Sequence, residues 1–244
     1  MELERFQNEE DLARAAADFV VSRAGEAVRR NGKFTLALAG GQTPRRLYEL
    51  LARPPLSERI PWTRVHFFWG DERCVPPDHK DSNYNLAYQA LLSLVPTPPE
   101  NIHRMPGEVT PPDQGAARYE QDLRDFFDLA HGHAFPGFDL TIMGLGADGH
   151  TASLFPESEA LYKARPWVTA ALPPPDQGPA VPRLTMTVPA LNASKAVLFL
   201  VTGAAKRPAA KQIIEDPALA ARRYPAARIQ PRGNLYWFLD AAAY

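Results

Sequence analysis

Residues 138–156 read Phe-Asp-Leu-Thr-Ile-Met-Gly-Leu-Gly-Ala-Asp-Gly-His-Thr-Ala-Ser-Leu-Phe-Pro. The first six form an apolar run of strand length, and three glycines then surround an acid, Asp148, and an imidazole, His150. Glycine lets a backbone approach a ligand closely, and open α/β sheets bind ligands where strands end. By itself a histidine among glycines is more often a turn residue than a catalytic one. We predict a strand, an active-site loop and then a short helix capped by Thr151 or Ser153.

Apolar runs alternate with helical patterns along the rest of the chain. Strands are predicted at 34–39, 65–69, 167–171, 183–188, 196–201 and 234–239, and helices at 9–30, 45–51, 82–94, 113–130 and 204–215. This alternation predicts a doubly wound, mainly parallel open sheet with helices on both faces. The proline-rich segment 173–182 is short enough to be a loop, so one domain spanning 1–244 is expected.

Composition excludes several classes of protein. The chain has 244 residues, 45% of them hydrophobic, and a formal net charge of −1, which gives no basic field for nucleic acid. There is no apolar run of the roughly 18 residues that would indicate a membrane span. A single cysteine, Cys74, suits a reducing compartment, and the acidic start lacks a signal-peptide pattern. A cytoplasmic location is therefore expected.

The segment Gly40-Gly41-Gln42-Thr43-Pro44 joins a predicted strand to a predicted helix. Thr43 stands at the N-cap position and Pro44 at the first helical position. Unpaired amides and the positive end of the helix dipole favour a phosphate at such a junction. An ordinary βα turn with a good cap would have the same pattern.

Two other strand ends carry charge. Asp71-Glu72-Arg73 follows the strand at 65–69, and Lys206 follows the strand at 196–201. A charged triplet is usually a solvated loop and a lysine usually a surface charge. At strand ends, however, arginine and lysine can hold a phosphate or a carboxylate. Since strand ends meet at one edge, we expect a pocket for a small anion, such as a phosphorylated metabolite.

Metal and covalent chemistry are disfavoured. The other histidines lack metal-ligand spacing, and His131 and His133 are expected to be exposed loop residues rather than zinc ligands. Arg73 could lower the pKa of the neighbouring Cys74. With no evident base nearby, we expect this thiol to be packed rather than nucleophilic.

Four blocks together resemble the 6-phosphogluconolactonase family, which shares its NagB/RpiA-like fold with glucosamine-6-phosphate isomerases and deaminases. The blocks are residues 39–44, 69–76 with Ser82-Asn83, 143–156, and 183–185 through 202–206. They cover nearly the whole chain in the family's order. The Asp-Gly-His-Thr-Ala-Ser-Leu-Phe-Pro segment is specific to the lactonase branch. Gln42 departs from the family pattern, which commonly has serine there.

The resemblance implies hydrolysis of 6-phospho-D-glucono-1,5-lactone to 6-phosphogluconate in the oxidative pentose phosphate pathway, with no cofactor or metal. It implies His150 as general base, with Asp148 either orienting the imidazole or lying nearby as a structural acid, and Arg73 at the carbonyl or at the phosphate. The phosphate would be bound by Gly40, Gly41, Gln42 and Thr43 with Lys206, and the sugar or oxyanion by Asp71, Gly144, Gly146 and Gly149.

Two other functions stay open. One is a glucosamine-6-phosphate deaminase or isomerase, against which the residues 151–156 argue. The other is a non-enzymatic sugar-phosphate sensor, which the lack of a helix-turn-helix or basic face disfavours. The expected partner is the small phosphosugar lactone alone, with neither nucleic acid nor membrane, and the expected state is a monomer or a weak homo-oligomer.

Overall fold

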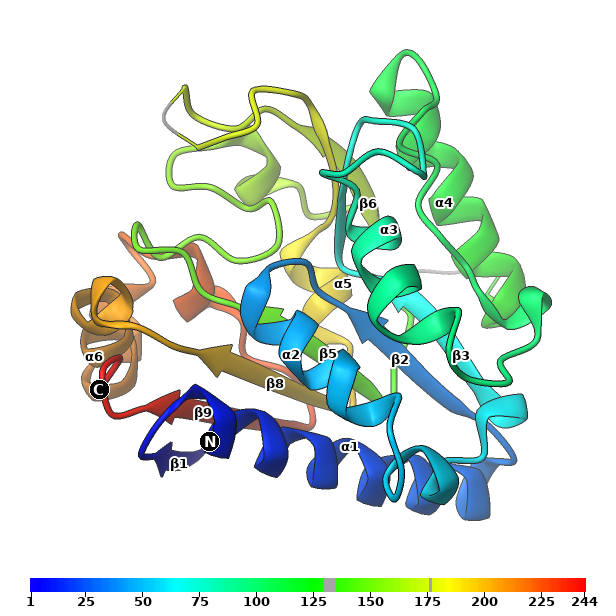
Figure 1. The fold of residues 1–244 in the computed structure, drawn as a ribbon. Coiled ribbons are helices and arrows are strands. Elements are labelled where there is room, and N and C mark those ends of the chain that lie inside the picture. Colours follow the sequence, from blue (N-terminus) through cyan, green and yellow to red (C-terminus); the bar gives the residue numbers. More distant parts are fainter. Residues whose placement is uncertain (130–134, 176) are drawn as a thin grey trace.

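A six-stranded sheet in the order β1-β9-β8-β5-β2-β3 forms the centre of the molecule (Figure 1). The computed structural model describes residues 1–129, 135–175 and 177–244. All five strand pairs in this sheet are parallel. The strands are β1 (Glu2–Phe6), β2 (Phe34–Leu38), β3 (Val65–Trp69), β5 (Leu140–Gly144), β8 (Ala196–Val201) and β9 (Asn234–Asp240).

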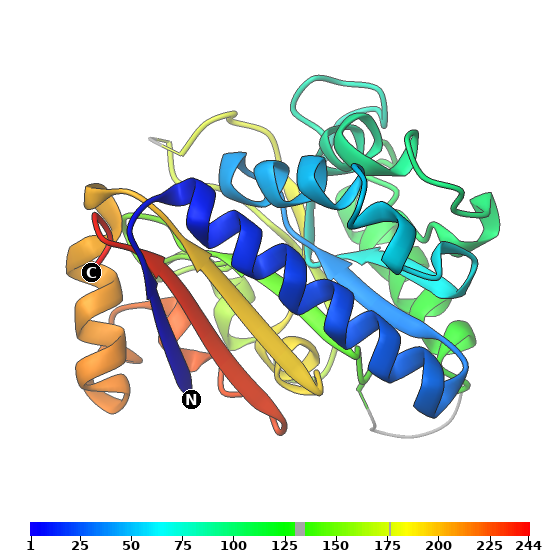
Figure 2. The same ribbon diagram turned by 60° about the horizontal axis from the view of Figure 1, so that its bottom comes forward.

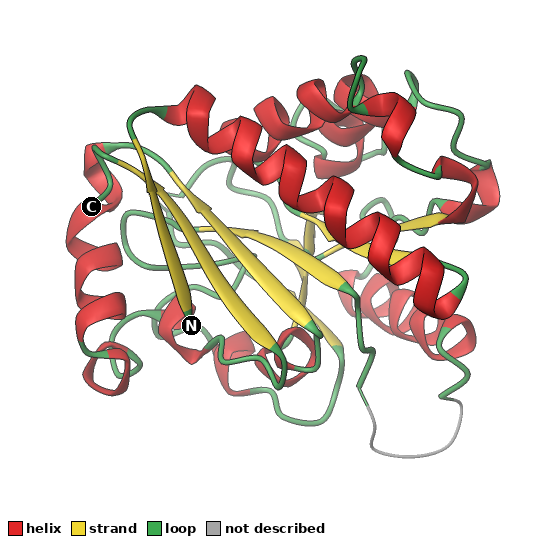
Figure 3. Ribbon diagram, turned by 90° about the horizontal axis from the view of Figure 1, so that it is seen from below, coloured by secondary structure: helices red, strands yellow, loops and turns green. Residues whose placement is uncertain are grey.

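Helices cover both faces of this sheet, which is the predicted doubly wound arrangement. Helix α1 runs diagonally across one face (Figures 2 and 3), with α2 beside it, and α5 and the short C-terminal helices lie behind the sheet. Every residue of β2 and β8 is buried, as expected for strands covered on both sides. The α-helices are α1 (Glu9–Asn31), α2 (Gln42–Leu51), α3 (Asn83–Ala87), α4 (Pro112–Phe126), α5 (Val188–Asn192), α6 (Arg207–Glu215) and α7 (Pro217–Ala220).

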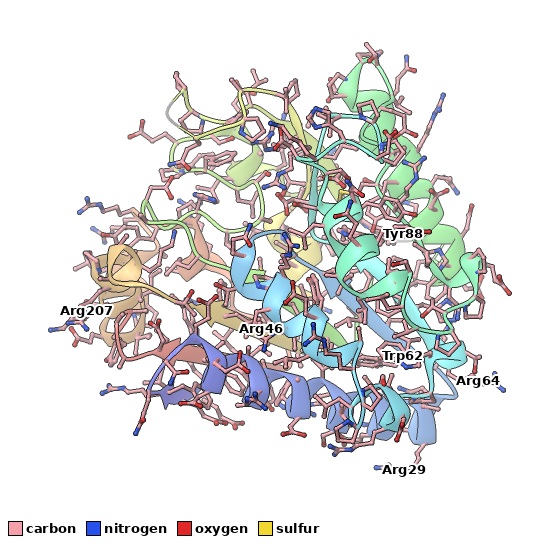
Figure 4. The ribbon with its side chains drawn as sticks, in the orientation of Figure 1. Arg29, Arg46, Trp62, Arg64, Tyr88 and Arg207 are labelled. Carbon is pink, nitrogen blue, oxygen red and sulfur yellow. The ribbon has the colours of Figure 1, made fainter. Side chains whose placement is uncertain are left out.

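Local signals fix both ends of α1. The side chain of Asn8 accepts a hydrogen bond from the amide of Asp11 at 2.9 Å. Gly32 ends the helix at φ 75°, a left-handed conformation that glycine adopts without strain. Arg46 of α2 donates two hydrogen bonds to Glu10 of α1, at 2.7 and 3.0 Å, and so links the two helices (Figure 4).

A second, antiparallel sheet of three strands in the order β4-β7-β6 lies beyond β3. It consists of β4 (Asp71–Arg73), β6 (Val168–Ala171) and β7 (Arg183–Met186), and α4 packs against it. Gly70 joins the sheets, because its amide donates to Leu38 of β2 and its carbonyl accepts from Met186 of β7. The prediction missed that the charged triplet 71–73 is a strand, since its hydrogen-bond partner lies more than 100 residues away.

Several other predicted elements need correction. Helix α2 begins at Gln42 with Gly41 as its N-cap, so Thr43 does not cap it. No helix begins at Thr151 or Ser153; the chain turns there, and Ala152 has φ 48°. The helix predicted to reach residue 94 changes after α3 into a π-helix, Tyr88–Leu92.

Strand β1 at the edge of the main sheet and several short helices were also not predicted. Strand β1 was not predicted, because only pairing with β9 makes its polar sequence a strand. His131 and His133 lie outside the described residues. Short 3₁₀ helices occupy Ser57–Arg59, Trp62–Arg64, Pro99–Asn101, Glu159–Tyr162, Ala204–Lys206 and Pro225–Arg228.

Candidate active site

A cavity of about 370 Å³ opens at the carboxyl ends of the central strands. Strand order reverses here, because the chain passes from β2 outward to β3 and later returns to β5 on the other side of β2. Such a switch point is where open α/β sheets bind ligands. The predicted site residues that line it are Gly40, Gly41, Gln42, Thr43, Asp71, Arg73, Gly144, Gly146, His150 and Lys206.

The turn between β2 and α2 forms one wall. Gly41 has φ 104°, and a Cβ on Gly40 would lie 1.8 Å from Oδ1 of Asn83, so both positions require glycine. The first turn of α2 holds no acidic residue. Its amides therefore present an uncompensated positive dipole end to the cavity, which suits an anion.

Hydroxyls and a lysine complete this wall. The hydroxyls of Thr43 and Thr202 are 2.7 Å apart and link the β2 turn to the end of β8. Lys206 lies one helical turn later and also lines the cavity. Thr202 is not among the predicted site residues, although its position directly after a strand was a signal that could have identified it.

His150 lines the same cavity and forms a pair with Asp148. Nδ1 of His150 lies 2.6 Å from Oδ1 of Asp148, and the His150 amide donates to the same oxygen at 3.1 Å. A carboxylate accepts, so Nδ1 carries the hydrogen and Nε2 keeps a lone pair. Asp148 does not line the cavity. It orients the ring from behind.

The charge of this pair is also defined. Burial raises the pKa of Asp148, but the hydrogen bonds and charge of His150 outweigh burial and bring the pKa below its usual value. Asp148 is therefore a carboxylate at neutral pH. It can hold the neutral ring in one tautomer and stabilise the ring after it gains a proton.

Gly146 and Gly149 have steric roles, and their amides are already hydrogen-bonded. The Gly146 amide donates to the His150 carbonyl at 2.8 Å, and the Gly149 amide donates to the Gly146 carbonyl at 3.0 Å. Neither amide can also stabilise an oxyanion. A Cβ on Gly149 would lie 2.3 Å from the ring of Tyr224, and Gly149 does not line the cavity. Its predicted contact with the sugar has no support in this geometry.

Arg73 enters from β4. One of its nitrogens, Nη1, donates to the Asp81 carbonyl at 2.9 Å and to Oδ1 of Asn83. Within the described part of the chain, no hydrogen bond from its Nε or Nη2 is recorded, so these groups can donate into the cavity. Asn83, which also lines the cavity, is a further site residue that the prediction did not include.

Glu72 anchors the segment that carries Asn83. Its carboxylate accepts from the amides of Arg73, Asn83 and Tyr84 and from the Ser82 hydroxyl, all within 2.9 Å. Burial raises the pKa of Glu72, and these hydrogen bonds only partly oppose that rise. Since the side chain is 2% exposed, its role is to fix the start of α3 rather than to bind a ligand.

Cys74 is not suited to nucleophilic catalysis. Burial raises the pKa of its thiol to about 11. Arg183, across the second sheet, lowers this pKa, whereas the neighbouring Arg73 does not act as the sequence suggested. Cys74 does not line the cavity.

Two further properties concern the described residues as a whole. They contain no group of three or more histidine, cysteine, aspartate or glutamate side chains placed to hold a metal ion. Each of their helices is too short or too polar to cross a lipid bilayer.

Comparison with known proteins identifies relatives of the whole chain. The family model for glucosamine-6-phosphate isomerases/6-phosphogluconolactonase matches residues 7–237. A 6-phosphogluconolactonase of Nostoc sp. is 44% identical over 232 residues, which are 95% of this chain and 92% of that protein. One of Synechocystis sp. is 44% identical over 97% of this chain and 94% of its own.

Solved structures agree with this result. The 6-phosphogluconolactonase from Thermotoga maritima matches with a TM-score of 0.82 and 30% identity, covering 98% of this chain and 99% of its own. A monomeric glucosamine-6-phosphate deaminase matches with a TM-score of 0.84 and 20% identity over 100% of this chain and 98% of its own, which shows the shared fold alone. The chain belongs to the glucosamine-6-phosphate isomerase/6-phosphogluconolactonase family.

Proposed function

We propose that this chain is a 6-phosphogluconolactonase, which hydrolyses 6-phospho-D-glucono-1,5-lactone to 6-phosphogluconate in the oxidative pentose phosphate pathway. One observation carries the proposal: a carboxylate-held histidine and a helix N-terminus suited to phosphate line the same cavity. The names of the relatives that are 44% identical support the same reaction.

The reaction begins with attack of water on the lactone carbonyl. Nε2 of His150 accepts a proton from that water as its oxygen bonds to the carbonyl carbon. A positioned general base of this kind accelerates a reaction by about 10²–10⁴-fold. Asp148 stays ionised and stabilises the imidazolium that forms. The imidazolium then returns the proton to the ring oxygen as the ester bond breaks, which yields the acid and a free hydroxyl.

We assign Arg73 to the carbonyl. The amides of Gly146 and Gly149 already donate within the loop, so they cannot bind the developing oxyanion. The Nε and Nη2 groups of Arg73 are directed donors of the kind that stabilise such charge. The phosphate is then bound by the α2 amides at Gln42 and Thr43 and by Lys206.

The test is lactone turnover. The lactone is generated in situ from glucose 6-phosphate, and its disappearance is compared with spontaneous hydrolysis. Acceleration by the protein is expected. No acceleration would reject the lactonase, and ammonia release from glucosamine 6-phosphate would favour the deaminase. Binding of sugar phosphates with neither reaction would favour a sensor.

We also propose that residues 1–244 form one domain that acts as a cytoplasmic monomer or weak homo-oligomer. Apolar side chains from both sheets join one buried core, which supports a single domain. Gel filtration with light scattering would test the oligomeric state.

A further inference from the structure

Asp71 and Ser153 lie 82 residues apart in sequence, but Oγ of Ser153 donates to Oδ2 of Asp71 at 2.7 Å. We propose that Asp71 is a positioning residue that joins the His150 loop to Arg73 and fixes the spacing between them. The inference rests on the proposed function and deepens it, since it replaces the expected contact between Asp71 and the sugar.

The Ser153 side of this link reaches the general base. Ser153 is three residues after His150 and 1% exposed. Its amide donates to the Thr185 hydroxyl of β7 at 3.3 Å, so both ends of the residue are tied to the second sheet. Ala152, which lies between His150 and Ser153, has φ 48°. A non-glycine residue keeps this conformation only where surrounding contacts impose it. The Ser153–Asp71 bond is one such contact.

The other side of the link reaches the cation. Nδ2 of Asn83 donates to Oδ1 of Asp71 at 3.2 Å and to the Asp71 carbonyl at 2.8 Å. This orientation directs Oδ1 of Asn83 towards Arg73, whose Nη1 donates to it. If the Asn83 amide turned over, two donors would face each other at Arg73. Asp71 therefore sets the direction of the Asn83 amide and, through it, the Arg73 guanidinium.

Both carboxylate oxygens of Asp71 are thus committed to protein donors, and the residue is only 9% exposed. No protein cation lies within 4 Å of it among the described ion pairs, so neutral donors from the start of α3 and from the His150 loop hold its charge. Asp71 also lines the cavity, and each of its carboxylate oxygens accepts a hydrogen bond from a different segment of the protein. The arrangement suits a fixed connection between two catalytic groups.

The test measures kcat, KM and calorimetric binding of 6-phosphogluconate for three variants. The calorimetric stoichiometry gives the fraction of protein that binds product, and each kcat is divided by that fraction. Ser153→Ala should lower kcat at least about tenfold, because small displacements of a catalytic group are costly, and leave product affinity within about threefold. Asp71→Asn should lower kcat at least as much. The double variant should fall no more than about threefold below Asp71→Asn, since the carboxylate to which Ser153 donates is already lost.

Ser194→Ala is the matched control. Ser194 is also fully buried, and its hydroxyl lies 2.8 Å from that of Thr141, but it does not contact the His150 loop. It should keep wild-type kcat per competent site. A purely structural role for Ser153 would lower the competent fraction in both serine variants and leave kcat per site unchanged.

Three results would overturn the link. They are wild-type kcat in Ser153→Ala, multiplicative losses in the double variant, and loss of product affinity alone in Asp71→Asn. If Asp71→Asn does not fold, the comparison of the two serine variants decides. Wild-type turnover is measured first, so absence of lactone hydrolysis rejects the proposed function, whereas normal turnover with an inert Ser153→Ala rejects only the link.

Discussion

Two histidine sites in this molecule differ in what surrounds the ring. His150 lies beside a carboxylate at the edge of the sheet, with Nδ1 2.6 Å from Asp148. His66 and His103 lie beside each other at β3, with Nδ1 of His66 3.2 Å from Nε2 of His103. The second pair has no carboxylate partner among the described contacts and packs against aromatic rings instead.

The environment of the second pair opposes protonation. The His103 ring stacks on Phe68 with centroids 4.4 Å apart, and both imidazoles contact Phe126. Burial, the neighbouring His66 and the Lys33 charge lower the pKa of His103 to about 4. A histidine is therefore a candidate base because it lies at a strand end and has a carboxylate partner, and not because of residue type alone.

The largest expected effect on turnover comes from removing the His150 ring. His150→Ala should lower kcat by about 10²–10⁴-fold and change KM little, because the ring acts in the transition state. His66→Asn is the matched control and should keep kcat within about twofold at pH 8. Similar losses in the two variants would erase the distinction between the sites.

A smaller loss should follow from crowding the same ring. A Cβ on Gly146 would lie 2.1 Å from Nδ1 of His150 and 2.5 Å from Oδ1 of Asp148. Gly146→Ala must therefore displace the pair and should lower kcat about 10²-fold. Gly137→Ala precedes the same strand and has its nearest neighbour at 3.8 Å, so it should be neutral. Normal turnover in Gly146→Ala would show that the close pairing of His150 with Asp148 is not the reactive arrangement.

Titration of the buried histidine pair, His66 and His103, should change the free energy of unfolding rather than turnover. The pKa of His103 is near 6.5 in the unfolded chain and about 4 when folded, so the unfolded chain binds more protons between these values. The free energy of unfolding should therefore decrease as pH falls from 6.5 towards 4. Because the ring is only half-buried, solvent screening limits the loss to about 1–2 kcal/mol.

Urea unfolding at several pH values between 7.5 and 4.5 measures this loss. His103→Asn should flatten the dependence on pH, since the titrating ring is gone. An identical slope in wild type and variant would assign the acid sensitivity to other groups.

The smallest effect is expected at Cys74. With the pKa of its thiol raised to about 11, only about 0.1% is thiolate at pH 8. Cys74→Ser should keep kcat within about twofold, and iodoacetamide should inactivate the wild type slowly. Rapid inactivation that the lactone prevents would return a covalent route to consideration.

Local patterns were sufficient to predict every strand of the main sheet except β1. The limits of β8 and β3 and both caps of α1 follow from apolar runs and from neighbours close in sequence. From their positions at strand ends, the β2 turn, Arg73 and His150 were predicted to meet at one edge of the sheet, and they line one cavity.

Contacts between distant segments could not be predicted in this way. Strand β4 pairs with β7, where Asp71 faces Thr185, and next to the turn at Ala152 the hydroxyl of Ser153 donates to Asp71. The helix predicted after His150 had good local capping signals, but tertiary hydrogen bonds determined another conformation. Asn83 shows no local sign of its role, since its importance comes from its two partners on β4.

The pairing of β1 with β9 has a consequence for the order of synthesis. Glu2 lies opposite Tyr236, so β1 must wait until β9, more than 200 residues later in the chain, has been synthesised before it gains a hydrogen-bonded neighbour. Until then the growing chain exposes the outer side of β8, which needs β9 to cover it. Completion of this half of the sheet is therefore expected only after β9 has been synthesised, and a nascent polypeptide stalled before β9 should be prone to aggregate.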